Sequence, residues 1–187
     1  MNKALFLDRD GVINVDHGYV GHYADFQYID GIFTLIRRYQ DSGFVPVIVT
    51  NQSGIARGYY TESDFCLLME RVQQDFNEHG IHQVRVYHCP HHEQGSVAQF
   101  ARPCDCRKPA PGMLIKAQQE LNIDVARSVM IGDSWRDIVA ADAAGVRRSF
   151  YLTNGSITQE MLKELDEKHS VNQVATLAEI RDIEEGR

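Results

Sequence analysis

The stretch that decides the fold is Phe6-Leu7-Asp8-Arg9-Asp10-Gly11-Val12, which continues an apolar run that begins at Ala4. A short apolar run of this kind is typical of a buried parallel strand. Side chains alternate along an extended backbone, so Asp8 and Asp10 are expected on one side, with Arg9 pointing away. Two carboxylates this close repel each other unless a divalent cation or a shared proton compensates their charge. Taken alone, the stretch is equally compatible with solvated acids at an ordinary strand end.

Short runs rich in Val, Ile and aromatic residues recur along the chain and predict further strands. The expected strands cover residues 4–7, 44–50, 84–88, 128–131 and 148–152. Helical periodicity between them predicts helices over 61–79, 112–122 and 135–144, the first of them capped by Thr61. The alternation predicts an α/β fold with a doubly wound, Rossmann-like parallel sheet in the strand order 3-2-1-4-5.

Length and composition indicate one domain over residues 1–187, with a loop at 89–106 inserted in it. The tail is expected to form a helix over 157–168, an edge strand over 171–175 and a last charged helix. A net charge of -7 argues against a nucleic-acid partner. No apolar run is long enough for a secretory signal or a membrane span, so we expect a cytoplasmic protein without a membrane partner. The absence of an unused apolar stripe favours a monomer.

Four polar motifs fall at strand ends or at the entry to a helix. They are Asp8-x-Asp10, Thr50-Asn51-Gln52-Ser53-Gly54, Arg107-Lys108-Pro109 and Gly132-Asp133-Ser134-Trp135-Arg136-Asp137. In a parallel sheet these positions gather at one end. Each motif alone has a plain structural explanation, such as a turn or a helix cap. Together they supply acids, a hydroxyl, backbone amides and a lysine, the groups that phosphoryl transfer requires.

In this order and at this spacing, the four motifs resemble the haloacid dehalogenase superfamily of phosphatases, over roughly residues 4–152. The resemblance implies that Asp8 is the nucleophile and forms an aspartyl-phosphate intermediate. It implies that Asp10 is the general acid for the leaving alkoxide and then the base that activates water. It also implies a catalytic Mg²⁺ bound by Asp8, the backbone carbonyl of Asp10, and Asp133.

The same resemblance assigns Thr50 and Lys108 to the transferring phosphoryl group, with the lysine acting as a point charge. Asp137 is expected to tether Lys108 or to cap its own helix rather than to bind the metal. Ser134 is a departure, because superfamily members often have lysine or arginine at this position. That difference puts the strength of phosphate binding in doubt, but not the mechanism.

A second cluster consists of two ligand pairs, Cys89-x-His91 and Cys104-x-Cys106, separated by twelve residues. Three thiolates and an imidazole form a closed set typical of a structural Zn²⁺ site. The eighteen residues from 89 to 106 have little apolar content, so a metal is expected to organise them and to position Arg107 and Lys108. His92 is the rival ligand and is interpreted as a supporting or substrate-facing residue. Cys66, on a helix, is expected in the core.

The connections 10–50 and 58–84 have room for loops and single helices only. Many superfamily members insert a separate cap domain at one of these two places. None fits here, so we expect a capless member. Its lid would consist of the small loops 14–24 and 53–59 together with residues 89–106, here called the zinc loop.

Three stretches of sequence limit the range of possible substrates: 16–20, 50–58 and the zinc loop. They resemble the phosphatases that remove the C7 phosphate of heptose 1,7-bisphosphates in lipopolysaccharide synthesis. The alternative is a histidinol-phosphate phosphatase, which typically has a shorter zinc loop. A catalytically silent zinc-stabilised binding protein is disfavoured, since the acid pair and the lysine are present. The resemblance implies that the sugar bisphosphate is bound by Asp16, His17, Gly18, Tyr19, Asn51, Gln52, Ser53 and Arg107.

Overall fold

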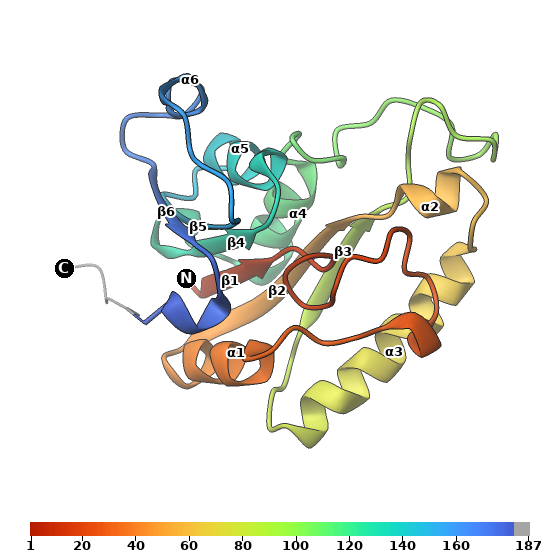
Figure 1. Cartoon of the computed structure of the whole chain (residues 1–187), viewed down its shortest axis with the longest axis horizontal. Coiled ribbons are helices and arrows are strands. Elements are labelled where there is room, and N and C mark those ends of the chain that lie inside the picture. Colours follow the sequence, from red (N-terminus) through yellow and green to blue (C-terminus); the bar gives the residue numbers. More distant parts are fainter. Residues whose placement is uncertain (182–187) are drawn as a thin grey trace.

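The computed structural model describes residues 1–181 and contains a six-stranded, fully parallel sheet (Figure 1). The strand order is β3-β2-β1-β4-β5-β6, so the predicted order is confirmed and the expected edge strand extends it. The strands are β1 (Lys3–Leu7), β2 (Phe44–Asn51), β3 (Arg85–Cys89), β4 (Val129–Gly132), β5 (Arg148–Leu152) and β6 (Ser170–Val174).

Helices cover both faces of the sheet, and β1 shows why. Leu5 and Leu7 pack in the core beneath α1 (Ile32–Asp41) and α3 (Glu62–Glu78). Ala4 and Phe6 point to the opposite face, in the core beneath α4 (Gly112–Leu121) and α5 (Trp135–Ala143). These four side chains, Ala4 to Leu7, are fully buried, as expected for a central strand covered on both sides. The short elements are α2 (Ser53–Ala56), α6 (Gln159–Leu162), η1 (Tyr23–Asp25), η2 (Val125–Arg127) and η3 (Leu177–Glu179).

Two parts of the tail differ from expectation. Only residues Gln159–Leu162 of the predicted helix 157–168 are helical. This segment is mostly exposed, and helices this short depend on packing an apolar face. The last charged helix is replaced, as far as residue 181, by the 3-10 turn η3, and the rest of that prediction lies outside the described residues.

Cys66 is exposed, so its expected place in the core is wrong. The core face of α3 includes Phe65 and Met69. Cys66 directly follows Phe65, and consecutive helical residues do not share a face, so its side chain lies beside the core face rather than on it. The predicted cap of α3 is confirmed. Thr61 Oγ1 accepts a hydrogen bond from the Asp64 backbone N–H (3.0 Å), and Asp64 accepts one from the Thr61 backbone N–H (2.8 Å).

The connections of the sheet contain no cap domain within residues 1–181. The segment between β1 and α1 contains only η1, and the segment between β2 and β3 contains only α2 and α3. The long zinc loop follows β3 and runs above α2 in Figure 1. No helix in the described part of the chain is long and apolar enough to cross a membrane.

Candidate active site

A polar cavity of about 320 Å³ lies at the carboxyl ends of β1, β2 and β4. Because all strands are parallel, their ends bring together side chains that are far apart in the sequence. The cavity contains most of the site residues expected from the sequence: Asp8, Asp10, Asp16, Gly18, Tyr19, Asn51, Gln52, Ser53, Arg107 and Asp133.

Lys108 is a fully buried cation beside Asp8. Its Nζ lies 3.0 Å from Asp8 Oδ1 and 2.6 Å from Asp137 Oδ1, and it donates a hydrogen bond to the Val49 carbonyl (2.7 Å). Burial lowers the pKa of Lys108, but the carboxylates of Asp137 and Asp8 outweigh burial and raise it overall, so the lysine is charged. Asp137 makes both expected contacts, because its other oxygen accepts a hydrogen bond from the Ser134 backbone N–H (3.0 Å) at the start of α5.

Carboxylate oxygens of Asp8, Asp133 and Asp137 all lie within 4.8 Å of one another. Burial, together with the charge of Asp137, raises the pKa of Asp8 to about 8 and that of Asp133 to about 6. One ammonium group cannot compensate three carboxylates in a buried site, and hard oxygen donors are the ligands that Mg²⁺ prefers. The donor set therefore fits a divalent cation.

Gly11 permits this arrangement. A Cβ at Gly11 would lie 1.8 Å from Asp133 Oδ2, and the residue has a φ of 84°. Any side chain here would displace Asp133 from the other acids, so the glycine after the acid pair is required by the close approach of the two loops.

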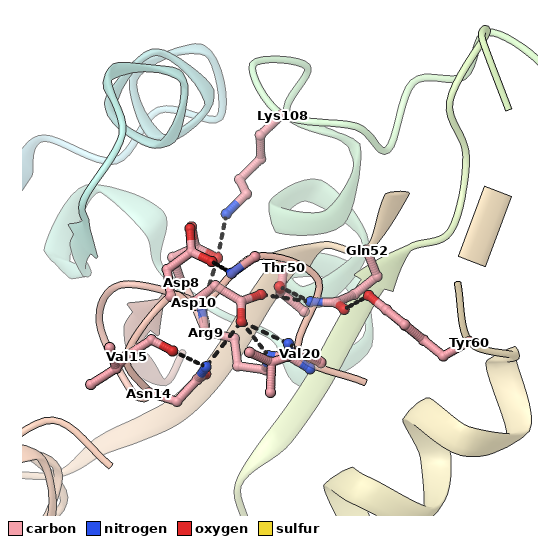
Figure 2. Close-up of polar contacts among 12 residues, drawn as sticks. Asp8, Arg9, Asp10, Asn14, Val15, Val20, Thr50, Gln52, Tyr60 and Lys108 are labelled. Atoms are coloured by element: carbon pink, nitrogen blue, oxygen red, sulfur yellow. Dashed lines mark hydrogen bonds and ion pairs between the residues drawn. The ribbon is translucent and has the colours of Figure 1, made fainter. Parts of the chain in front are cut away.

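Three hydrogen-bonding side chains hold the Asp10 carboxylate (Figure 2). Oδ1 accepts from Arg9 Nη2 (2.7 Å) and Asn14 Nδ2 (3.0 Å), and Oδ2 accepts from Gln52 Nε2 (3.0 Å). The expectation that Arg9 points away from the acids is wrong for its guanidinium, which is fully buried and also donates to the Val20 carbonyl (2.5 Å). A buried guanidinium needs a compensating carboxylate, and Asp10 is the one within reach.

Two amide side chains expected to face the substrate are bonded to protein groups in the cavity wall. Asn51 donates to the Lys108 carbonyl (3.1 Å) and accepts from the Lys108 backbone N–H (3.0 Å). This pair of bonds fixes the third motif to the end of β2. Gln52 donates to the hydroxyl of Thr50 (2.8 Å) as well as to Asp10.

Part of the cavity lining is basic. Arg57, Arg107 and Arg136 line the cavity together with His92, whose Nε2 lies 3.2 Å from Arg57 Nη2. Burial and the neighbouring cations lower the pKa of Arg107, and its Nη1 is buried without a hydrogen-bond partner. These basic groups make the cavity suited to an anion.

Arg57 and Arg136 line the cavity but are not among the site residues expected from the sequence. The sequence does contain a signal for Arg57, since this residue belongs to the 50–58 stretch that resembles the heptose phosphatases. Arg136 is a residue of the fourth motif and brings a positive charge to the cavity, which the neutral Ser134 also lines.

The lid residues divide between two depressions. Asp16 accepts a hydrogen bond from the Gly18 backbone N–H (2.9 Å), and Tyr19 meets Tyr59 edge to face at a centroid distance of 4.6 Å. Both tyrosines are about half exposed, and Tyr19 lines the cavity. His17 does not line the cavity but lines a neighbouring depression, which it shares with Phe26.

The zinc-loop ligands come together as the sequence predicts. Donor atoms of Cys89, His91, Cys104 and Cys106 lie within 4.8 Å of one another. Cys89 Sγ lies 3.5 Å from Cys104 Sγ and 3.0 Å from Cys106 Sγ, and His91 Nδ1 lies 3.3 Å from Cys106 Sγ. Three thiols and one imidazole around a common point suit a tetrahedral Zn²⁺. The same loop contacts the end of α2, where Val97 N–H donates to the Ala56 carbonyl (2.9 Å).

Comparison with known proteins identifies the family. A family model described as HAD-hyrolase-like matches residues 105–180. The D-glycero-beta-D-manno-heptose-1,7-bisphosphate 7-phosphatase of Vibrio cholerae is 44% identical over 180 residues, which are 96% of this chain and 93% of that protein. This chain belongs to the haloacid dehalogenase-like phosphatases. A Yersinia pestis protein of the same name is 50% identical over 152 residues, 81% of each chain.

Two solved structures with a similar fold support the assignment of this chain to the haloacid dehalogenase-like phosphatases. A putative HAD-like phosphatase from Mesorhizobium loti has a TM-score of 0.83 and 34% identity, covering 95% of this chain and 82% of that one. The D,D-heptose 1.7-bisphosphate phosphatase from B. bronchiseptica, complexed with magnesium and phosphate, has a TM-score of 0.74 and 29% identity, covering 91% and 92%.

Proposed function

We propose that the chain is a Mg²⁺-dependent phosphatase that removes the C7 phosphate of D-glycero-β-D-manno-heptose 1,7-bisphosphate. The observation that carries this proposal is one cavity lined by Asp8, Asp10 and Arg107, with the buried ammonium of Lys108 paired to Asp8. The names of its relatives support a heptose bisphosphate over histidinol phosphate as the substrate. They also support the β anomer of that heptose over the α anomer. We further propose a cytoplasmic monomer, one domain over residues 1–187, that serves lipopolysaccharide heptose synthesis.

In the first step, Asp8 attacks the phosphorus atom and the bond from phosphorus to the sugar oxygen breaks. Asp10 gives its proton to the leaving alkoxide, so the sugar departs as an alcohol and Asp8 is phosphorylated. In the second step, water transfers a proton to Asp10 and attacks phosphorus. The acyl phosphate bond breaks, which releases inorganic phosphate and restores Asp8. Lys108 and Thr50 bind the equatorial phosphoryl oxygens throughout.

The two metals have different roles in this proposal. Mg²⁺ held by Asp8, the Asp10 carbonyl and Asp133 supplies positive charge that offsets the repulsion between a carboxylate and a phosphate. Zn²⁺ held by Cys89, His91, Cys104 and Cys106 takes no part in the chemistry. It holds the loop that leads into Arg107 and Lys108, so its contribution is to position these two residues.

The substrate's second phosphate is assigned to Arg107, whose buried Nη1 has no protein partner. Replacing Arg107 with alanine removes a charge-assisted hydrogen-bond donor. We expect kcat/KM for the bisphosphate to fall by about 10- to 100-fold, while that for a heptose 7-monophosphate changes little. Arg85→Ala, an exposed arginine on β3, is the matched control. Equal losses for the two substrates would contradict the assignment.

The remaining substrate contacts are assigned to the lid and the β2 loop. Ser53 and Tyr19 line the cavity, and Asp16 and Gly18 form a turn that also lines it. A role for His17 requires movement of the lid, because this residue lines the neighbouring depression.

Phosphate release with Mg²⁺ tests the function directly. The α and β anomers of heptose 1,7-bisphosphate are compared with histidinol phosphate, and Asp8→Asn serves as the blank. We expect the β anomer to be turned over fastest. Faster turnover of histidinol phosphate would reject the substrate, and no turnover of any of them by metal-loaded protein would favour the silent binding protein.

A further inference from the structure

We propose that Tyr60 and Gln52 are positioning residues that form a directional hydrogen-bond relay to Asp10 and Thr50. Through the relay, the proton of Asp10 and the hydroxyl hydrogen of Thr50 are aimed at the phosphorylated substrate. The inference rests on the proposed phosphatase function, and it gives a task to a buried amide and a buried phenol that the mechanism above does not use.

The relay is a continuous chain of short contacts (Figure 2). Tyr60 OH donates to Gln52 Oε1 (2.5 Å), and Gln52 Nε2 donates to Thr50 Oγ1 (2.8 Å) and to Asp10 Oδ2 (3.0 Å). Exposed fractions are 6% for Tyr60, 1% for Gln52 and 0% for Thr50. Water therefore has little access to replace any of these bonds, and a lost partner leaves a buried polar group unsatisfied.

Asp10 and Tyr60, at the two ends of the relay, determine which of its groups donate and which accept. Asp10 as a carboxylate only accepts hydrogen bonds, so the amide of Gln52 must turn its NH₂ group toward Asp10 and its oxygen toward Tyr60. The opposite orientation would place two acceptors, Gln52 Oε1 and Asp10 Oδ2, against each other. Burial raises the pKa of Tyr60 to about 12, which keeps its hydroxyl a donor at neutral pH.

The direction decides what Thr50 can do. A hydroxyl has one hydrogen, and Thr50 Oγ1 is already an acceptor from Gln52. Its own hydrogen is therefore not used by Gln52 and is available to donate to a phosphoryl oxygen. If Gln52 accepted instead, the hydroxyl would turn its lone pairs toward the phosphate.

The direction also decides which oxygen of Asp10 carries the transferred proton. Oδ1 is surrounded by the N–H donors of Arg9 and Asn14, which leaves little room for a proton there. Oδ2 has a single donor, Gln52, and so keeps a lone pair for the proton. Gln52 thus holds the oxygen that faces the leaving group.

Tyr60 is fixed in place by two lid segments. A Cβ at Gly54 would lie 2.3 Å from Tyr60 Cε1, so the ring fits only because this position in α2 has no side chain. A Cβ at Gly21 would also lie 2.3 Å from the ring. The phenol therefore packs between the loop after β1 and the loop after β2, and it connects the geometry of both with Gln52.

The test uses two variants that preserve shape. Gln52→Glu has the same size but cannot donate, and it places a carboxylate against Asp10. We expect kcat to fall about 100-fold with a KM change of less than about 3-fold. Tyr60→Phe removes only the hydroxyl, and we expect kcat to fall about 10-fold with an unchanged melting temperature. Tyr28→Phe, which removes a hydroxyl bonded to Asp75 outside the cavity, is the control and should leave kcat unchanged.

Leaving-group dependence distinguishes the relay from a purely structural role. β-Glycerophosphate needs a proton on its leaving alkoxide, whereas p-nitrophenolate leaves without one. In Gln52→Glu, the first turnover of β-glycerophosphate should slow at least about 10-fold more than that of p-nitrophenyl phosphate. Equal slowing of both substrates, or wild-type kcat in Gln52→Glu and Tyr60→Phe, would overturn the relay. Neither substrate depends on the heptose assignment, so rejection of heptose would leave this test intact.

Discussion

Replacing Asp8 by asparagine is expected to abolish phosphate release, lowering kcat by a factor on the order of 10⁴ or more. Asparagine has the shape of aspartate but is not a nucleophile toward phosphorus, so no phosphorylated enzyme can form. The measurement is single-turnover release of phosphate in the presence of Mg²⁺, with mass spectrometry for the acyl phosphate in the wild type. A variant that keeps more than a few per cent of the wild-type rate would reject Asp8 as the nucleophile.

Measurements of stability distinguish a loss of the nucleophile in Asp8→Asn from misfolding of the variant. Burial and the nearby acids raise the pKa of Asp8 to about 8 without metal. The native state then binds a proton that the unfolded state has lost above its ordinary pKa, so this group lowers the free energy of unfolding as pH rises from about 4 to 8. Without metal, Asp8→Asn should therefore be at least as stable as the wild type at pH 7.5. A large drop in its melting temperature would show that the variant is structurally damaged.

Loss of one zinc ligand is the second large expected effect. Cys106→Ser removes a thiolate from the four-donor set, and the loop 89–106 has few apolar side chains to replace the metal. We expect the bound zinc to be lost and the melting temperature to fall by about 10 °C or more, which corresponds to several kcal/mol for a chain of this size. Zinc content by atomic absorption and a thermal melt check both expectations.

The loop continues into Arg107 and Lys108, so Cys106→Ser should also reduce kcat, although no zinc ligand touches the reacting atoms in the proposed mechanism. Cys66→Ser is the matched control, because Cys66 is exposed on α3 and lies outside the cluster. It should change neither zinc content nor activity. Full zinc occupancy and an unchanged melting temperature in Cys106→Ser would contradict a structural zinc site.

Most of the framework was predictable from local patterns. The apolar runs located β1 to β5 to within one residue at each end, since strands in the interior of a parallel sheet are covered on both faces and have few alternatives to Val, Ile and aromatic side chains. The four polar motifs could be placed together in advance, because a parallel sheet gathers its carboxyl ends at one edge. The prediction of a helix over 157–168 was wrong because packing decides whether a short helix forms. The sequence has helical spacing, but the fold gives this segment little apolar surface to cover.

The sequence by itself determined where each chemical group enters the site: the acids after β1, the hydroxyl at the end of β2, the lysine before α4 and the third acid after β4. Only the tertiary structure decided how the long side chains use their polar atoms. Arg9 folds back to Asp10, Gln52 connects Asp10 with Thr50, and Arg57 and Arg136 line the cavity together with Arg107. Such side chains have several rotatable bonds, and spacing along the chain leaves their direction open. Contacts between distant segments select one direction, because burial penalises every donor or acceptor without a partner.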